Sequence, residues 1–302
     1  MKSRYPDFFI IGAMKCATSS LHDQLQSLPD VFMSEPKEPN FFSDDAAFSR
    51  GMDWYCSLFE AAKKGDLVGE SSTHYAKLPT YPQAVARMAT AVRSPKIIYV
   101  MRHPIDRLIS QYIHEWSQGN LNEDIDSAIN SHPELVNYSR YHYQLQPYLD
   151  RFGHEKVLPL FFDRLKADPD RELQRLCDFI GYRKPVFWRN DLSPSNVSSQ
   201  RIRKFPLYNL LIESPPMRIL RRMLIPRWVR NGVKCRLTMR ERPQLSLESR
   251  SRLSEIFDRD LAQLGDLFGV PLTCENFSQV TAAGPLYWRA TTRTQGECHE
   301  YP

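Results

Sequence analysis

Short apolar runs that alternate with helical segments constrain the fold of this chain more than any other feature. The first run, Asp7–Gly12, is almost continuously apolar and ends in glycine, which predicts a strand buried on both faces. A helix is expected to follow it, capped by Thr18 or Ser19 and running to about Ser27 with leucines along one stripe. The chain therefore begins with a strand, a loop and a helix.

The same pattern returns further along the chain. Strands are predicted at Leu67–Glu70, Lys96–Met101 and Lys156–Phe162, and helices at about Pro104–Ser117 and Pro169–Ile180. Strands that alternate with helices form a parallel sheet covered on both faces, and such sheets bind ligands at the carboxyl ends of their strands. We therefore predict an α/β fold, namely a P-loop-like three-layer α/β/α arrangement around a central parallel sheet.

Beyond Gly181 the chain is divided by prolines, and we expect loops and short helices over about 182–245. A last helix is predicted over Leu247–Phe268, where apolar residues recur at helical spacing: Leu253, Ile256, Phe257, Leu261 and Leu264. From Cys274 onward the chain is polar. We accordingly expect one domain over residues 1–273, which ends in a mainly helical portion, and a polar tail over 274–302.

The composition is that of a folded protein with one large core, since 42% of the 302 residues are hydrophobic. No stretch of the sequence approaches the about 20 consecutive apolar residues that span a bilayer, so we expect a soluble chain without a transmembrane segment. The six cysteines form no CxxC pair and lack the spacing of zinc ligands. We interpret them as reduced thiols in a cytoplasm and expect no metal site.

The net charge of +5 is unevenly distributed, because Arg201–Arg240 holds eleven Lys or Arg residues and a single acid, Glu213. The interpretation that we favour is a pair of short amphipathic helices whose arginines are solvated. A rim for an anionic acceptor is the second interpretation, and peripheral contact with a membrane surface the third. We expect no nucleic-acid partner, and the sequence leaves the oligomeric state open.

The loop after the first strand, Gly12–Leu21, has the properties of an anion site. Backbone N–H groups at the start of a helix, together with the positive end of the helix dipole, form a cradle for phosphate. Lys15 adds a cation, and three consecutive hydroxyls at Thr18, Ser19 and Ser20 add donors. The lysine precedes these hydroxyls by three residues, unlike the lysine of a Walker A loop, which disfavours a kinase or ATPase. The alternative is an ordinary helix cap with a surface lysine.

A second anion site is predicted where the strand Lys96–Met101 meets the next helix. Arg102 follows this strand directly, and Ser110 lies two turns into the helix. A guanidinium at a strand end with a hydroxyl on the adjoining helix suits the 3′-phosphate of a nucleotide whose 5′ end lies on the first loop. The alternative is a helix-start arginine that pairs with Asp106.

Three motifs in this order resemble the sulfotransferases that use 3′-phosphoadenosine 5′-phosphosulfate (PAPS). They are the lysine loop Lys15–Leu21, the segment Glu38–Phe42, and the spacing Arg102-(x7)-Ser110 after a strand. The likeness is to the branch that contains the heparan sulfate sulfotransferases and their bacterial relatives, and it covers about Tyr5–Gly181. Because Golgi members of that branch carry an N-terminal anchor, we expect a bacterial cytoplasmic protein; a Golgi lumenal one would require that an anchor had been trimmed.

The resemblance implies a role for each of these positions. Lys15, Thr18, Ser19 and Ser20 would hold the 5′-phosphosulfate of PAPS, and Arg102 and Ser110 the 3′-phosphate. Cys16 and Ala17 stand where the family commonly has Gly-Gly or Thr-Gly, and both are small enough for close approach of the phosphate. Some family members close a Lys/Gly-rich segment over the nucleotide, for which Asn196–Lys204, with Arg203 and Lys204, is the candidate here.

The resemblance also implies a sulfuryl transfer to a hydroxyl or amine of an acceptor, with a carbohydrate or small metabolite favoured and 3′-phosphoadenosine 5′-phosphate (PAP) as product. Glu38 matches the position of the branch's proposed base, and Lys15 would stabilise the leaving group without a metal. Glu70 and His74 are competitors for the base, since another branch uses histidine. The alternative functions are a P-loop nucleotide kinase or NTPase and an inactive PAP-binding module.

Overall fold

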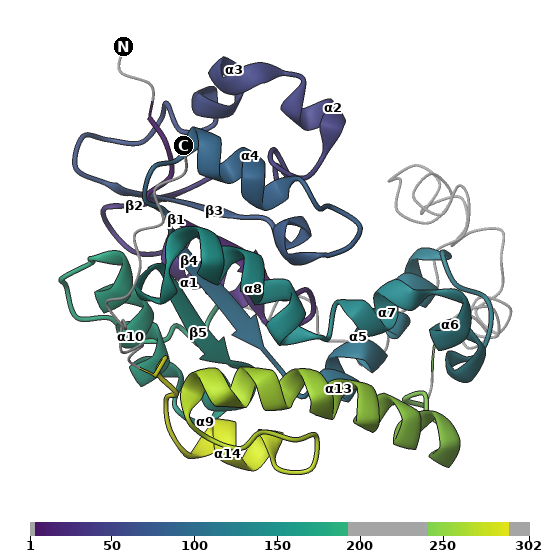
Figure 1. Cartoon of the computed structure of the whole chain (residues 1–302). Helices are drawn as coiled ribbons and strands as arrows, with labels where there is room; N and C mark the ends of the chain where they lie inside the picture. Colours follow the sequence, from purple (N-terminus) through teal and green to yellow (C-terminus); the bar gives the residue numbers. More distant parts are fainter. Residues whose placement is uncertain (1–3, 193–238, 240, 290–302) are drawn as a thin grey trace, which may run out of the picture.

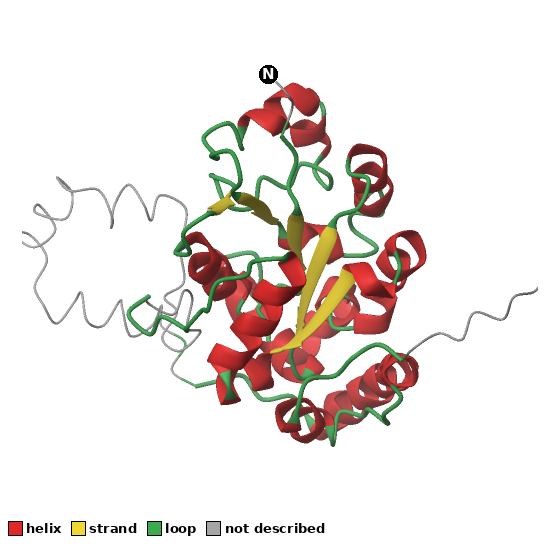
Figure 2. Ribbon diagram, turned by 90° about the vertical axis from the view of Figure 1, so that its left-hand side faces the viewer, coloured by secondary structure: helices red, strands yellow, loops and turns green. Residues whose placement is uncertain are grey.

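A parallel sheet of five strands forms the centre of the protein in the computed structural model, which describes residues 4–192, 239 and 241–289. The strand order is β2-β3-β1-β4-β5. The strands are β1 (Phe8–Gly12), β2 (Val31–Met33), β3 (Leu67–Ser71), β4 (Lys96–Met101) and β5 (Val157–Phe161). Helices cover both faces of the sheet (Figures 1 and 2), so the predicted α/β arrangement around a parallel sheet is confirmed.

The central strands are apolar along their whole length because both faces of the sheet are covered. Every residue of β1 and β5 is buried, and in β4 only the first, Lys96, is not fully so. This explains why the strands were recognisable as continuous apolar runs rather than as alternating patterns. The predicted β4 agrees with the structure at both ends, and the predicted β1, β3 and β5 agree to within a residue at each end.

Three predicted helices occur with nearly the expected bounds: α5 (Pro104–Gln118), α10 (Pro169–Ile180) and α13 (Leu247–Phe268). Each has a clear physical start, with proline in the first turn of α5 and α10 and the Ser246 side chain capping α13. The predicted cap of α1 (Thr18–Gln26) was wrong. Its N-cap is Ala17, and no side chain of the described residues caps this helix. The Thr18 and Ser19 hydroxyls thus make no capping hydrogen bond to the backbone N–H groups of this helix.

Several short elements were not predicted, because each is brief or lacks a clear period. They are β2, the 3-10 turns Thr73–Ala76 and His154–Lys156, and the helices α2 (Asp45–Phe48), α3 (Gly51–Ser57), α4 (Ala84–Ala91), α6 (Ile125–Ser131), α7 (Pro133–Asn137), α8 (Tyr141–Phe152) and α9 (Phe162–Ala167). The longest of them, α8, contains Pro147, which sequence rules treat as a helix breaker.

The end of the described chain packs onto the sheet layer. Helix α13 is joined to α8, since the Asp260 carboxylate accepts from the backbone N–H groups of His142 and Tyr143 at 2.9 and 3.0 Å. The segment expected as a polar tail opens with a further helix, α14 (Phe277–Ala283), in which Phe277 is fully buried. Past it, Trp288 Nε1 donates to the Val157 carbonyl at 2.6 Å. The described residues that follow 273 therefore pack against the rest of the chain.

Most of the basic, proline-punctuated portion lies outside the described residues, and so do Arg203 and Lys204. The predicted domain boundaries accordingly stay a prediction. Within the described residues no helix combines the length and the hydrophobicity that crossing a bilayer requires. The four cysteines in that part of the chain are buried free thiols: Cys16, Cys56, Cys177 and Cys274.

Candidate active site

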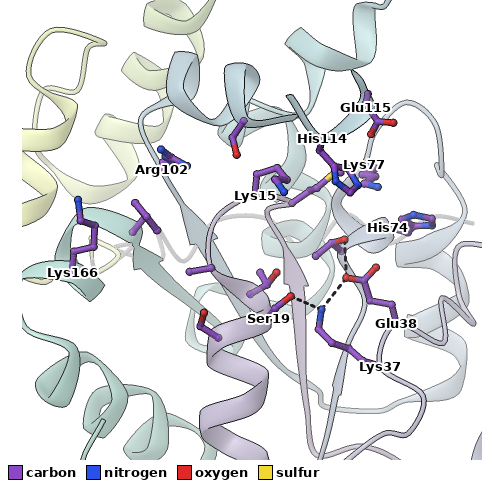
Figure 3. A pocket seen from close by; sticks show the side chains of 17 residues that line it. Lys15, Ser19, Lys37, Glu38, His74, Lys77, Arg102, His114, Glu115 and Lys166 are labelled. Atoms are coloured by element: carbon purple, nitrogen blue, oxygen red, sulfur yellow. Dashed lines mark hydrogen bonds and ion pairs between the residues drawn. The ribbon is translucent and has the colours of Figure 1, made fainter. Parts of the chain in front are cut away.

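One cavity of about 670 Å³ lies at the carboxyl ends of the strands. Every strand contributes through the segment that follows it: the loop after β1, the turn after β2, the 3-10 turn after β3, the start of α5 after β4 and the start of α9 after β5. Its lining comprises Met14, Lys15, Ala17, Thr18, Ser19, Ser20, Lys37, Glu38, Thr73, His74, Lys77, Arg102, Ser110, His114, Glu115, Phe162 and Lys166. The two predicted anion sites and the predicted base thus share one cavity (Figure 3).

The loop after β1 makes a tight turn that presents the start of α1 to the cavity. Lys15 and Ala17 both have left-handed backbone, with φ of 71° and 65°. A Cβ on Gly12 would approach Tyr99 Cε2 to 2.8 Å, so the turn requires glycine there. The Ala13 N–H donates to the Val100 carbonyl at 2.9 Å and ties the loop to β4. The loop is therefore held as part of the sheet edge.

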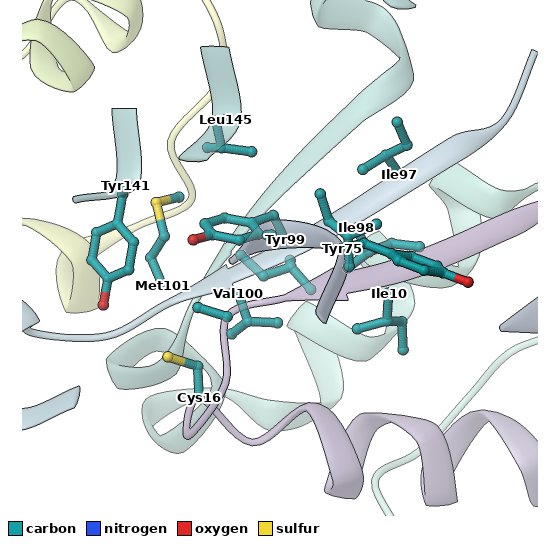
Figure 4. Packing of buried hydrophobic residues seen from close by; sticks show 14 of the residues in the cluster. Ile10, Cys16, Tyr75, Ile97, Ile98, Tyr99, Val100, Met101, Tyr141 and Leu145 are labelled. Carbon is teal, nitrogen blue, oxygen red and sulfur yellow. The ribbon is translucent and has the colours of Figure 1, made fainter. Parts of the chain in front are cut away.

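Cys16 does not line the cavity, although Lys15 and Ala17 on either side of it do. Its thiol points into the core beside Tyr141 and Val100 (Figure 4), and the side chain is fully buried. Burial raises the pKa of the Cys16 thiol to about 11, which keeps it protonated at neutral pH. The Cys16 side chain therefore packs in the core, and the expected contact of this residue with the nucleotide stays a prediction.

Arg102 lies at the opposite end of the cavity from Glu38 in Figure 3. Its guanidinium lies over the Phe162 ring, with Cζ 4.7 Å from the ring centroid, and Lys166 Nζ is 5.7 Å from the same centroid. The Tyr141 hydroxyl donates to the Arg102 carbonyl at 2.5 Å and positions the backbone. The alternative pairing of Arg102 with Asp106 is not formed among the described residues, because Asp106 pairs with Arg242.

Phe162 and Lys166 were missed by sequence reasoning, although a signal for them existed. β4 and β5 are parallel neighbours, with Met101 opposite Phe161 in register. The residues that follow these two positions, Arg102 and Phe162, must therefore emerge side by side. Knowing the strand order would have been necessary, since the sequence does not say which strand neighbours β4.

Glu38 is carried by a loop whose backbone is fastened to the segment after β3. The Glu38 N–H donates to the Ser71 carbonyl at 3.0 Å, and the Asn40 N–H donates to Ser72 Oγ at 3.1 Å. Both residues have left-handed backbone, with φ of 58° and 52°. Phe42, fully buried beyond them, anchors the loop in the core. The Glu38 carboxylate is thereby turned into the cavity.

The Glu38 side chain is 33% exposed and pairs with Lys37, whose Nζ lies 3.1 Å from Glu38 Oε1. The same oxygen accepts from Thr73 Oγ1 at 3.4 Å. Glu38 thus forms an ion pair with Lys37, and its carboxylate lines the cavity nevertheless. Lys37 was not predicted as a site residue.

Glu70, a competitor for the base, is fully buried and absent from the cavity lining. Its carboxylate accepts from the hydroxyls of Ser72 and Tyr75, both at 2.6 Å, and from that of Tyr55. Burial raises the pKa of Glu70, which the three hydroxyl donors counteract. Because Ser72 and Tyr75 also accept from backbone N–H groups of the Glu38 loop, Glu70 supports that loop from below.

Replacing Glu70 by alanine is expected to lower the free energy of unfolding by about 3 kcal/mol, because it leaves buried hydroxyls without their acceptor. Urea denaturation followed by circular dichroism measures the change. The exposed Glu60 provides the control, and Glu60→Ala is expected to stay within about 0.5 kcal/mol of the parent chain. Equal unfolding midpoints for the two variants would contradict this account of Glu70.

His74 and Lys77 line the cavity near Glu38. The His74 ring stacks on Tyr81, with centroids 4.7 Å apart and planes at 13°. Burial lowers the pKa of His74 to about 4, so the ring is neutral at neutral pH and a weak base. Burial also lowers the pKa of Lys77 to about 8, against the attraction of Glu38. The stacking favours packing or substrate contact over catalysis for His74.

The charge of the lining is strongly asymmetric. Among the residues that the structure describes, Glu38 and Glu115 are the acidic side chains of the lining, whereas five are basic: Lys15, Lys37, Lys77, Arg102 and Lys166. A concave site with an excess of fixed cations attracts and holds an anionic ligand. The cavity therefore suits a ligand with several negative charges. At one end it also offers the Glu38 carboxylate, which could accept a proton.

Most of the chain matches one known protein family. The family model described as "Sulfotransferase domain" matches residues 5–265. Heparan sulfate glucosamine 3-O-sulfotransferase 3B1 of Mus musculus is 30% identical over 196 residues, which are 60% of this chain and 47% of the relative. The 3A1 enzyme of Homo sapiens is 29% identical over 193 residues, or 60% and 45% of the two chains. The chain thus spans about half the length of the curated relatives that it matches.

Solved structures share the fold. A sulfotransferase from Alicyclobacillus acidocaldarius superposes with a TM-score of 0.64 at 24% identity, over 89% of this chain and 98% of that one. A mouse sulfotransferase complexed with PAP gives 0.53 at 14% identity, over 92% and 90%. These similarities confirm the α/β class of the fold.

Proposed function

The chain belongs to the sulfotransferase domain family, and on that premise we propose that it transfers a sulfuryl group from PAPS to a hydroxyl or amine of an acceptor. The observation that carries the proposal is that one cationic cavity brings together the lysine loop, Arg102 with Ser110, and Glu38. Its volume of about 670 Å³ lies within the range of small-molecule sites, roughly 300–1,000 Å³.

The donor would extend along the cavity from Arg102 to the start of α1. Arg102 and Ser110 would hold the 3′-phosphate, with Lys166 as an additional cation beside them. Lys15 and the first-turn hydroxyls of α1 would hold the 5′-phosphosulfate, where the helix dipole favours negative charge. Figure 3 supports this orientation, since Lys15 lies between the Arg102 end and the Glu38 end.

Bound PAPS supplies a sulfuryl group on a phosphate leaving group. Lys15 would neutralise the charge that develops on the bridging oxygen as the sulfur–oxygen bond breaks. Glu38 would accept the proton of the acceptor hydroxyl or amine, which attacks sulfur from the side opposite the phosphate. Fixed cations supply the electrostatic stabilisation in this scheme, and we expect it to proceed without a metal ion.

For the acceptor we propose a carbohydrate. The curated relatives are named for glucosamine in heparan sulfate, and a sugar presents the hydroxyl or amine that the reaction needs. Near Glu38, the cavity wall offers Thr73, His74 and Lys77 as polar contacts, and Tyr81 stacks on the His74 ring. Lys77 gives this end a cation for an acidic substituent.

Calorimetric titration with PAP, without and then with magnesium, tests the proposal. We expect micromolar, magnesium-independent binding that Arg102→Ala and Lys15→Ala each weaken about 10- to 100-fold, because each loses a charged hydrogen bond to phosphate. Arg189→Ala, which removes an exposed arginine away from the cavity lining, is the control and should leave the affinity unchanged. Binding of ATP with magnesium in place of PAP would refute the sulfotransferase assignment.

A further inference from the structure

Lys37 contacts both the proposed donor site and the proposed base. Its Nζ donates to Ser19 Oγ at 2.9 Å and pairs with Glu38 Oε1 at 3.1 Å, as the dashed lines in Figure 3 show. Ser19 belongs to the first turn of α1, whereas Glu38 belongs to the loop after β2. One ammonium group therefore spans the gap between the proposed donor site and the proposed base.

The position of Lys37 matters because of where the sulfur atom of the donor is expected to lie. In-line transfer places sulfur between the phosphate leaving group, on the α1 side, and the acceptor oxygen, on the Glu38 side. Lys37 lines the cavity between these two groups, and its side chain is 27% exposed. An ammonium group has three N–H donors, and the two bonds described above use only two of them.

The cavity also poses an electrostatic problem that Lys37 is placed to solve. The sulfuryl group of PAPS carries a negative charge, and transfer requires it to lie close to the Glu38 carboxylate. Two like charges in a partly desolvated cavity repel, which would weaken donor binding and hold the acceptor away. A cation between them converts this repulsion into two attractions.

We propose that Lys37 is a further catalytic residue, which binds the sulfuryl oxygens of the donor while it holds the carboxylate of Glu38. This inference rests on the proposed sulfotransferase function. The acceptor proton passes to Glu38 as the new sulfur–oxygen bond forms, and the bond to phosphate breaks with its electron pair moving to PAP. Lys37 remains protonated throughout, and its contribution is to offset the sulfuryl charge.

The proposal predicts that Lys37, unlike the other lysines of the cavity, affects the binding of PAPS but not that of PAP. PAPS carries the sulfuryl group and PAP does not, so a residue that binds sulfuryl oxygens affects the two nucleotides unequally. Lys166, beside Phe162 and Arg102, is instead placed to affect both equally through the 3′-phosphate. Lys166→Met is therefore the matched control for Lys37→Met.

The experiment is calorimetric titration of the full chain and of these variants with PAP and with PAPS. We expect Lys37→Met to weaken PAPS binding at least tenfold and to change PAP binding less than about twofold. Adding Glu38→Gln to Lys37→Met should restore most of the lost PAPS affinity, because the uncompensated carboxylate is then removed. Lys37→Arg should retain PAPS affinity to within about threefold, since the charge is kept.

Two other binding results would contradict the proposed role of Lys37. Equal weakening of PAP and PAPS by Lys37→Met would mean that Lys37 contacts phosphate or serves only the fold. No weakening of either would mean that it does not contact the donor. Absence of any PAP and PAPS binding in the parent chain would instead refute the proposed function itself, which keeps the two failures distinguishable.

Discussion

Replacing Glu38 by glutamine is expected to lower kcat for sulfuryl transfer by about 10²- to 10⁴-fold, the usual contribution of a positioned general base. The amide keeps the size of the side chain and can still accept from Thr73, but it cannot take up the acceptor proton. Transfer from radiolabelled PAPS to a glucosamine-containing oligosaccharide measures the rate. PAP affinity should stay within about threefold of the parent chain, because Glu38 lies at the other end of the cavity from Arg102.

His74→Asn provides the matched comparison for the base. His74 lines the same end of the cavity, but its stacking on Tyr81 and its pKa of about 4 fit a substrate contact. We expect a loss in kcat of less than about tenfold, with the larger change in KM. A loss of about 10³-fold for His74→Asn, with a small one for Glu38→Gln, would reverse the two roles.

Replacing Lys15 by alanine is expected to lower kcat by about 10²- to 10³-fold, in addition to its effect on nucleotide affinity. The left-handed turn at Lys15 places this residue just before α1, where charge would develop on the leaving phosphate oxygen in the proposed mechanism. An interaction that strengthens as this charge grows lowers the barrier more than it tightens binding. Initial rates at saturating PAPS separate the two effects.

Lys15→Arg and Ser20→Ala are the comparison variants for Lys15→Ala. Arginine keeps the charge in a planar, bulkier form, so we expect partial activity, between the parent chain and Lys15→Ala. Ser20→Ala removes one neutral donor from the same turn and should cost less than about tenfold. If Lys15→Ala at saturating PAPS kept the parent kcat, Lys15 would serve binding alone and the leaving group would need another cation.

The residues that we propose for donor binding could be selected from the sequence because each group of them is local in the chain. Lys15, Thr18, Ser19 and Ser20 lie in one turn between a strand and a helix, and Arg102 and Ser110 lie in the next such junction. A strand end and a helix start fix the direction of these side chains with few other contacts. That both junctions face one cavity follows from the parallel strands that carry them.

The other residues of the cavity could not be predicted in the same way, because they are brought together from distant parts of the chain. Lys37 meets Ser19 only because β2 runs at the sheet edge next to β3, and β2 was too short to be recognised. Phe162 and Lys166 join Arg102 only because β5 pairs with β4. Glu70 looked like a candidate base at a strand end until its burial and three hydroxyl partners placed it behind the cavity wall.

The class of fold and the helices α5, α10 and α13 could be predicted from the sequence, since apolar periodicity is a property of neighbouring residues. The sequence could not predict which side chains share the cavity and which are buried behind it, because that depends on how distant segments pack. Cys16 and Lys15 are adjacent in the chain, yet one packs in the core and the other lines the site. The reason is that the left-handed turn at Lys15 and Ala17 sends successive side chains in different directions, and its path depends on the sheet that it is bonded to.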